Sequence, residues 1–228
     1  MLLLTGGLGV WAARRHPGRW VEPAARVLAL VILAAWAGEY LADVILEIWS
    51  TKYDLPFQLT DAVSLVSAAA LWSLVRGTPH ARLVELVYFW GLSASRQAIL
   101  TPDLAYDFPS VFYFTYFGYH IGAVLAALVL VFGLRMYPGR GAVARVYAAS
   151  LAWTALAGAG DLITGGNYMY LRAKPVHGSL LDVMGPWPWY IVSTAALALA
   201  MLLALAAIAA GVRRLDGRGE SVAVEATA

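Results

Sequence analysis

The sequence predicts an all-α polytopic membrane protein, a bundle of seven transmembrane helices of which the first is short. The chain has 228 residues, of which 61% are hydrophobic and only 13% carry a charge. Soluble domains are on average about half apolar and about a quarter charged. With a mean hydropathy of +0.69, a soluble fold would expose more apolar surface than these charges could keep in water. The composition therefore excludes water-soluble enzyme folds.

Six apolar runs are long enough to cross a bilayer, which takes roughly 20 residues of helix. Proline, glycine and arginine residues separate the runs. The predicted spans are Pro23–Trp49, Pro56–Val75, Ala81–Leu100, Ser110–Leu134, Gly141–Ile163 and Pro186–Val212. A seventh run, Met1–Ala13, is short and its arginines follow it, so we interpret it as a truncated first span with a start codon further upstream, and not as a signal peptide.

The basic residues predict the orientation, because arginine and lysine near short loops stay on the cytoplasmic side. Seven spans place twelve of the 16 basic residues on one side, whereas only Lys52, Arg172 and Lys174 lie on the other and Arg96 falls inside a span. The N-terminus is expected outside and the C-terminus in the cytoplasm, with the protein in the inner membrane of a bacterial cell. Residues 1–212 form one transmembrane domain, and the polar tail 213–228 is expected to be disordered.

Composition also restricts the partners. The net charge is only +2, and the basic residues form scattered pairs, so nucleic acid is not an expected partner. The absence of cysteine excludes disulfides, thiolate metal sites and a cysteine nucleophile. Phosphate-binding and dinucleotide-binding glycine motifs and the GxSxG motif are absent, and no cofactor is expected. Membrane lipids are the expected partners.

Ionisable groups inside the spans predict a functional site, because they are expensive there and usually face the interior. Glu39, Asp43 and Glu47 recur every four residues and should share one helix face. The other polar candidates come from four further spans: Gln58, Asp61, Arg96, Gln97, His120 and Asp161. All lie in the outer half of the membrane. They predict a cavity open to the outside, in which one or two carboxylates neutralise Arg96; the alternative is a buried ionic cluster that only fixes helix register.

His120 is the only histidine inside a predicted span. It could simply form a structural hydrogen bond to a neighbouring helix, or it could act as a general base, for which a neutral imidazole is suited. A metal site would have to combine it with Glu39 or Asp43. One histidine without cysteine ligands disfavours that interpretation, and no metal site is predicted.

Several loop motifs carry a family resemblance. The segments Leu55–Asp61, Tyr88–Leu92 with Gln97–Leu104, Asn167–Leu171 and Gly185–Tyr190 resemble the bacterial YwaF family of integral membrane proteins. More distantly, the chain is similar to eukaryotic seven-span lipid acyltransferases that use cysteine and histidine, and to androgen-induced lipid hydrolases that use threonine and histidine. Many bacterial members have histidine and cysteine where this sequence has Gln58 and Thr60. The resemblance implies Thr60 as nucleophile, His120 as its base and Asn167 as a supporting residue.

Three functions stay open at this point. A lipid ester hydrolase or acyltransferase would use Thr60 and His120, with Arg96 or Gln97 steadying the headgroup or oxyanion. A small-solute transporter or ligand-binding receptor would use Glu39, Asp43 and Arg96. In a structural or assembly protein, the same polar residues would only form a buried network.

Overall fold

The computed structural model describes residues 2–16, 18–104, 106–176 and 178–225, and seven helical segments run up and down in this part of the chain. The segments are α1 (Leu2–Arg15), α2 (Val21–Ile45), α3 (Leu59–Val75), α4 (Ala81–Trp90) with the π-helix η1 (Gly91–Ser95) and α5 (Arg96–Leu100), α6 (Val111–Leu128) with the π-helix η2 (Val129–Gly133), α7 (Ala142–Thr164) and α8 (Trp189–Glu225). Two 3₁₀ turns, η3 (Tyr168–Tyr170) and η4 (Leu180–Val183), lie in the last loop.

The all-α class is confirmed, and apolar helices of membrane-spanning length make this a multi-pass membrane protein. Four segments are long and apolar enough to cross a bilayer: Val21–Ile45, Val111–Gly133, Ala142–Thr164 and Trp189–Gly217. The predicted spans agree with the observed helices to within a few residues at most ends. One exception is α2, which ends at Ile45, while Glu47 has a φ of 59° outside the helix. The predicted row of three carboxylates is therefore a pair, Glu39 and Asp43.

The helix of the last predicted span extends into the polar tail. Helix α8 passes the predicted end of the last span and continues to Glu225. Arg14 of α1 donates to both carboxylate oxygens of Asp216, at 3.0 and 2.9 Å, and the Tyr137 hydroxyl donates to the same carboxylate. Arg135 also pairs with Asp216, at 3.8 Å. Three side chains from other segments therefore contact this carboxylate and tie the first turn after the span to the bundle.

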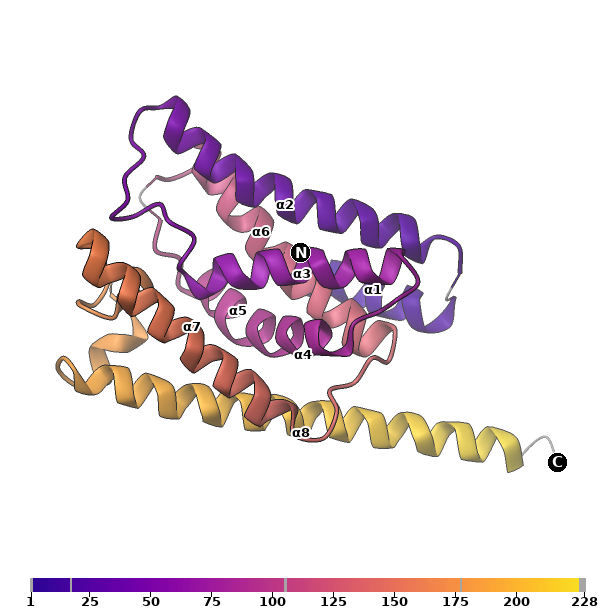
Figure 1. Cartoon of the computed structure of the whole chain (residues 1–228). Coiled ribbons are helices and arrows are strands. Elements are labelled where there is room, and N and C mark those ends of the chain that lie inside the picture. Colours follow the sequence, from indigo (N-terminus) through magenta and orange to yellow (C-terminus); the bar gives the residue numbers. More distant parts are fainter. Residues whose placement is uncertain (1, 17, 105, 177, 226–228) are drawn as a thin grey trace.

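Helices α3, α4 and α6 lie in the interior of the bundle and α2 runs along one outer side of it (Figure 1); most of the buried apolar side chains belong to these four helices. Helix α1 packs on η2, while α7 and α8 pair on the side of α4 away from α2. Small residues bring α2 and α6 together, as is common between membrane helices. A Cβ atom on Gly122 would lie only 2.5 Å from Ile32, and one on Gly118 only 2.9 Å from Ala35.

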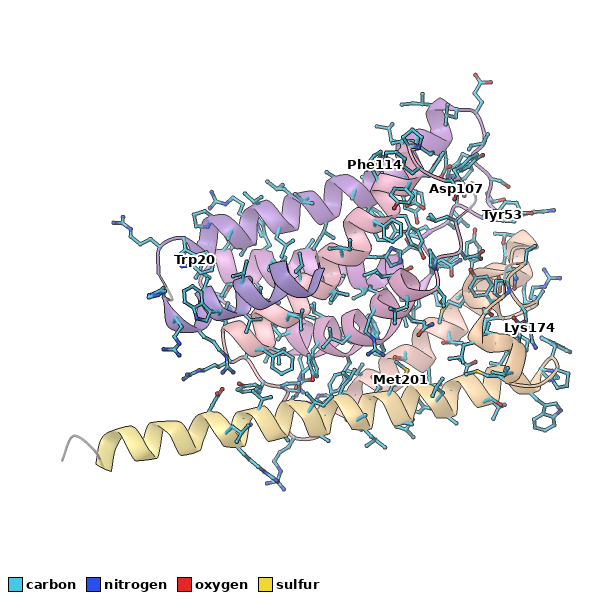
Figure 2. All side chains as sticks on the ribbon, turned by 180° about the vertical axis from the view of Figure 1, so that it is seen from behind. Trp20, Tyr53, Asp107, Phe114, Lys174 and Met201 are labelled. Carbon is cyan, nitrogen blue, oxygen red and sulfur yellow. The ribbon has the colours of Figure 1, made fainter. Side chains whose placement is uncertain are left out.

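The two ends of the bundle differ in character. The loops 46–58, 101–110 and 165–188 lie together at one end, which we call the loop end; the turns 16–20, 76–80 and 134–141 lie at the other, which we call the basic end. Figure 2 shows Tyr53, Asp107 and Lys174 at the loop end and Trp20 at the basic end. The connections between helices thus alternate between the ends as the predicted seven-span order requires.

The predicted orientation can be tested directly, because the chain has no cysteine of its own. Tyr53→Cys places a thiol at an exposed position of the loop end, and Thr78→Cys does so at the basic end. In intact bacterial cells, a membrane-impermeant maleimide should label Tyr53→Cys, and it should reach Thr78→Cys only after permeabilisation. Labelling with the opposite preference would reverse the orientation.

Candidate functional site

A buried carboxylate ties α2 to the start of α3. Asp61 is only 6% exposed, and its Oδ1 accepts hydrogen bonds from Trp36 Nε1 at 3.1 Å and from the Tyr40 hydroxyl at 2.9 Å. Its Oδ2 accepts from the backbone N–H of Gln58 at 2.9 Å. Three donors therefore compensate a charge that hydrocarbon could not solvate.

The local sequence explains why Asp61 takes this position. Gln58 precedes the first helical residue, and an acidic side chain three residues later can reach back to its free backbone N–H, as in one half of a capping box. The Gln58 side chain turns the other way, and its Oε1 accepts from the backbone N–H of Met169 at 2.9 Å. The start of α3 thus also anchors the last loop.

Glu39 lies beside Asp61, one turn along α2 from Trp36. Asp61 and Asp43 interact with it electrostatically, and so do the polar side chains of Tyr119 and Thr115 of α6. Its Oε2 is buried and has no hydrogen-bond partner. Among the described residues, no lysine or arginine forms an ion pair with Glu39, Asp43 or Asp61. Within the described residues, these three carboxylates therefore have no counter-ion.

His120 lies on the same face of α6 as Tyr116 and is only 1% exposed. Its Nδ1 is 2.7 Å from the Tyr116 carbonyl oxygen. The ring lies between Tyr116 and Tyr119, with centroid distances of 4.2 and 4.3 Å and interplanar angles of 33°. A carbonyl oxygen can only accept, so Nδ1 carries the proton and the lone pair is on Nε2. The ring is thus fixed both in orientation and in tautomer.

We call the side chains Trp36, Glu39, Tyr40, Asp61, Tyr119 and His120 the polar cluster; they come from α2, α3 and α6.

Two further buried hydroxyls in the core, those of Ser67 on α3 and Ser95 in η1, have no hydrogen-bond partner. Membrane helices show π-turns often near functional sites. In η1, Gly91 lets α4 approach α6, because a Cβ there would lie 3.1 Å from the Ala123 carbonyl oxygen.

The predicted neutralisation of Arg96 does not occur. Its side chain is exposed and forms no ion pair within the described chain. Gln97 bonds locally, from its Nε2 to the Thr101 hydroxyl at 3.0 Å. Both residues follow the π-turn η1, which adds a residue to the helical turn and so rotates everything after it relative to a regular helix. The sequence could predict the position of Arg96 along its helix, but it could not predict the direction in which its side chain points.

Three other predicted residues shape the last loop. The Oδ1 of Asp161 accepts from the backbone N–H of Tyr168 at 2.6 Å, and Asn167 bonds the backbone of Arg172 and Ala173. Together with Gln58 they fix the path of this loop across the loop end. The Tyr168 hydroxyl donates to the Thr51 carbonyl at 2.6 Å, and burial raises the pKa of this phenol, so it stays a donor at neutral pH.

Several predicted site residues are deeply buried: His120 and Asp161 are each 1% exposed. The Trp36 indole and the Tyr40 phenol bond the Asp61 carboxylate, and the predicted outward cavity stays a prediction. Two cavities, of about 310 and 550 Å³, lie at the basic end, and no predicted site residue lines either one. The described residues contain no group of three or more histidine or acidic side chains that could hold a metal ion.

The sequence analysis did not predict the aromatic members of the polar cluster, Trp36, Tyr40 and Tyr119, although their positions in the sequence indicate them. Tyrosine and tryptophan in membrane proteins usually lie near the interfaces, whereas Tyr119 lies beside His120 inside a span and Trp36 and Tyr40 flank Glu39. Helical spacing puts Trp36 and Tyr40 one turn apart on α2. Aromatic donors next to an ionisable residue within a span therefore indicate its hydrogen-bond partners.

The helices define a multi-pass membrane protein, and within its described part the buried carboxylates of the polar cluster form no ion pair with lysine or arginine. The family comparison is more specific: the TMEM164 family model matches residues 1–206, and the chain belongs to the TMEM164 family. The loop motifs suggested the YwaF family, and the family comparison does not confirm that name. No curated protein and no solved structure matches the chain.

The structure predicts a large stability cost for removing the Asp61 carboxylate. Asp61→Ala leaves three donors without their acceptor and should lower the free energy of unfolding by about 3 kcal/mol or more. Asp61→Asn should cost less, because the amide oxygen still accepts from Trp36 and Tyr40. Unfolding titrations in mixed micelles measure both, with Asp107→Ala at an exposed loop position as the control. Equal stabilities of Asp61→Ala and the control would contradict the role of this carboxylate.

Proposed function

We propose that this TMEM164 family member is a lipid-directed ester hydrolase or acyltransferase, with His120 as general base and Thr60 as nucleophile. The observation that carries the proposal is the hydrogen bond from His120 Nδ1 to the Tyr116 carbonyl oxygen. A general base needs a free lone pair and a third group that orients the ring. The Tyr116 carbonyl supports both requirements, since it leaves Nε2 unprotonated and holds the imidazole in place.

Thr60 supplies the hydroxyl group. It lies in the first turn of α3, next to Asp61, and its side chain is half-buried and forms no hydrogen bond within the described residues. Its hydroxyl is too weakly acidic to attack an ester unaided, so a base must take the proton as attack proceeds. Thr60 and His120 are not hydrogen-bonded to each other in the described chain. The proposal therefore requires that they approach when substrate binds, as catalytic contacts often tighten in the substrate complex.

The proposed reaction has two steps. Thr60 Oγ attacks the ester carbonyl carbon while its proton passes to His120 Nε2, and the alcohol part of the lipid leaves with that proton. The acyl–threonine bond is then cleaved by water or by a second lipid alcohol, whose proton returns through His120. Water gives hydrolysis, and an alcohol gives acyl transfer.

The surroundings favour a lipid substrate over a soluble one. The polar cluster lies between apolar helices of membrane-spanning length, so the proposal requires that a lipid ester reaches it from the bilayer when the helices part. Arg96 is exposed near the loop end, where it can attract a phosphate headgroup from outside the cluster. We also propose that this end faces the outside of a bacterial cell membrane, as the distribution of basic residues favours.

An active-site probe tests the enzyme directly. A fluorophosphonate should label the purified protein, and Thr60→Ala and His120→Ala should each reduce labelling and ester turnover by about 100-fold or more. Thr60→Ser, which keeps a hydroxyl, should retain part of the activity. Thr78→Ala and His80→Ala make the same changes at the basic end and serve as controls. Unchanged labelling in a folded Thr60→Ala or His120→Ala protein would overturn the proposal.

One observation favours a second candidate function, a proton-coupled transporter. Glu39 has a buried carboxylate oxygen without a partner, beside another carboxylate and without a cation. Such a group can take up and release a proton, and ionisable residues of this kind form proton relays in transporters.

Proteoliposomes distinguish the two functions. A transporter should acidify the vesicle lumen when a transported solute is added, and Glu39→Gln should abolish the signal of a lumenal pH dye. Glu22→Gln, at an exposed position near the basic end, is the matched control. Proton movement that is equal in Glu39→Gln and the control would exclude this candidate, and ester turnover by the same vesicles would favour the enzyme.

A further inference from the structure

A cavity at the basic end combines positive charge with an apolar wall. Its volume is about 310 Å³, and it lies between the turn that joins η2 to α7 and the middle of α8. Arg140 and Arg213 line it together with the apolar residues Phe89, Ala206 and Ala209. It lies at the opposite end from the polar cluster and shares no residue with it.

The two arginines have no counter-ion. Within the described part of the chain, neither Arg140 nor Arg213 forms an ion pair, and both side chains are exposed. Glu85 and Asp216, which contact the loop that carries Arg140, are already engaged. Glu85 accepts from Arg145 at 2.7 Å and pairs with Arg82 at 3.3 Å, while Asp216 is paired with Arg14 at 2.9 Å. The cavity therefore keeps an uncompensated positive charge.

The loop that carries Arg140 is held in place before any ligand binds. The backbone N–H of Gly139 donates to Glu85 at 3.2 Å, and the Tyr137 hydroxyl donates to Asp216. Gly141 has a φ of 74°, which glycine adopts without strain, and it starts α7. The first-turn amides of this 23-residue helix face the same end and add a favourable potential for an anion.

The opposite wall is apolar and narrow. Ala206, Ala209 and Ala210 of α8 line it, and small side chains along one helix face leave a groove in which a hydrocarbon chain can lie. Ala210 is exposed, so this groove is continuous with the outer surface of α8. A free inorganic anion would contact only the arginines. An anionic amphiphile would contact both the arginines and the apolar alanine wall.

From this combination we propose that the cavity binds one anionic phospholipid, with its phosphate between Arg140 and Arg213 and an acyl chain along the alanine face of α8. Basic pockets between helices at the positively charged side of a membrane protein suit phosphate headgroups of this kind. The site is independent of the proposed ester chemistry, because it lies at the other end of the bundle. Its role is to anchor the η2–α7 turn and α8 to the lipid leaflet.

Native mass spectrometry of the full chain in detergent tests the site. The probes are phosphatidylglycerol, phosphatidylcholine with the same acyl chains, and inorganic phosphate. The wild type should retain one phosphatidylglycerol in preference to phosphatidylcholine. The R140A/R213A variant should bind it more weakly by roughly tenfold or more, since it removes both basic groups that contact the lipid phosphate. The matched control is R19A/R214A, which removes two exposed arginines that do not line the cavity.

A second variant keeps every charge. Ala210→Trp fills the alanine groove and should reduce phosphatidylglycerol retention even if R140A/R213A does not fold. Equal binding of the two lipids by the wild type, equal binding by R140A/R213A and R19A/R214A, or full binding by Ala210→Trp would each overturn the proposal. Displacement of the lipid by millimolar inorganic phosphate would assign the arginines to a free anion and would also overturn it.

Discussion

The Asp61 carboxylate is the interaction on which the loop-end half of the bundle depends. A charge inside a membrane protein must be compensated by neighbouring groups, since hydrocarbon offers none. Here the compensation comes from an indole, a phenol and a backbone N–H, and not from a cation. The same contacts fix the approach of α2 to α3 and the first turn of α3. Through Gln58 they extend to the last loop, and the neighbouring Glu39 interacts with Tyr119 and Thr115 of α6.

The sequence predicted what depends on local composition. Apolar length predicted Ala81–Leu100 as one segment with the observed ends, and the charge pattern predicted which turns share an end. It could not predict the π-turn at Gly91–Ser95, because nothing in the composition distinguishes this turn from a regular one. The direction of Arg96 follows from that turn, and the predicted ion pair was wrong for this reason. His120 was correctly selected as the buried histidine of α6, but its partners, a main-chain carbonyl and two tyrosines, depend on tertiary packing.

The two ends of the protein divide the polar chemistry between them. At the loop end, Glu39 and Asp61 lie near aromatic side chains and form no ion pair with a described lysine or arginine, and His120 has a fixed tautomer. At the basic end, Glu85 and Asp216 are paired with arginines, and the arginines that line the nearby cavity are the ones we propose for a lipid phosphate. The proposed catalytic site at the loop end and the proposed lipid site at the basic end are therefore separate.

The tautomer of His120 is the most direct measure of the proposed chemistry, because a general base requires its lone pair on Nε2. The chain has four histidines, and replacing the other three by glutamine leaves His120 as the single histidine for nitrogen NMR after labelling with ¹⁵N-histidine. We expect a neutral ring with the proton on Nδ1, hydrogen-bonded to the Tyr116 carbonyl, and an unprotonated Nε2. A ring protonated on Nε2 alone would contradict both the observed contact and the role of His120 as the base.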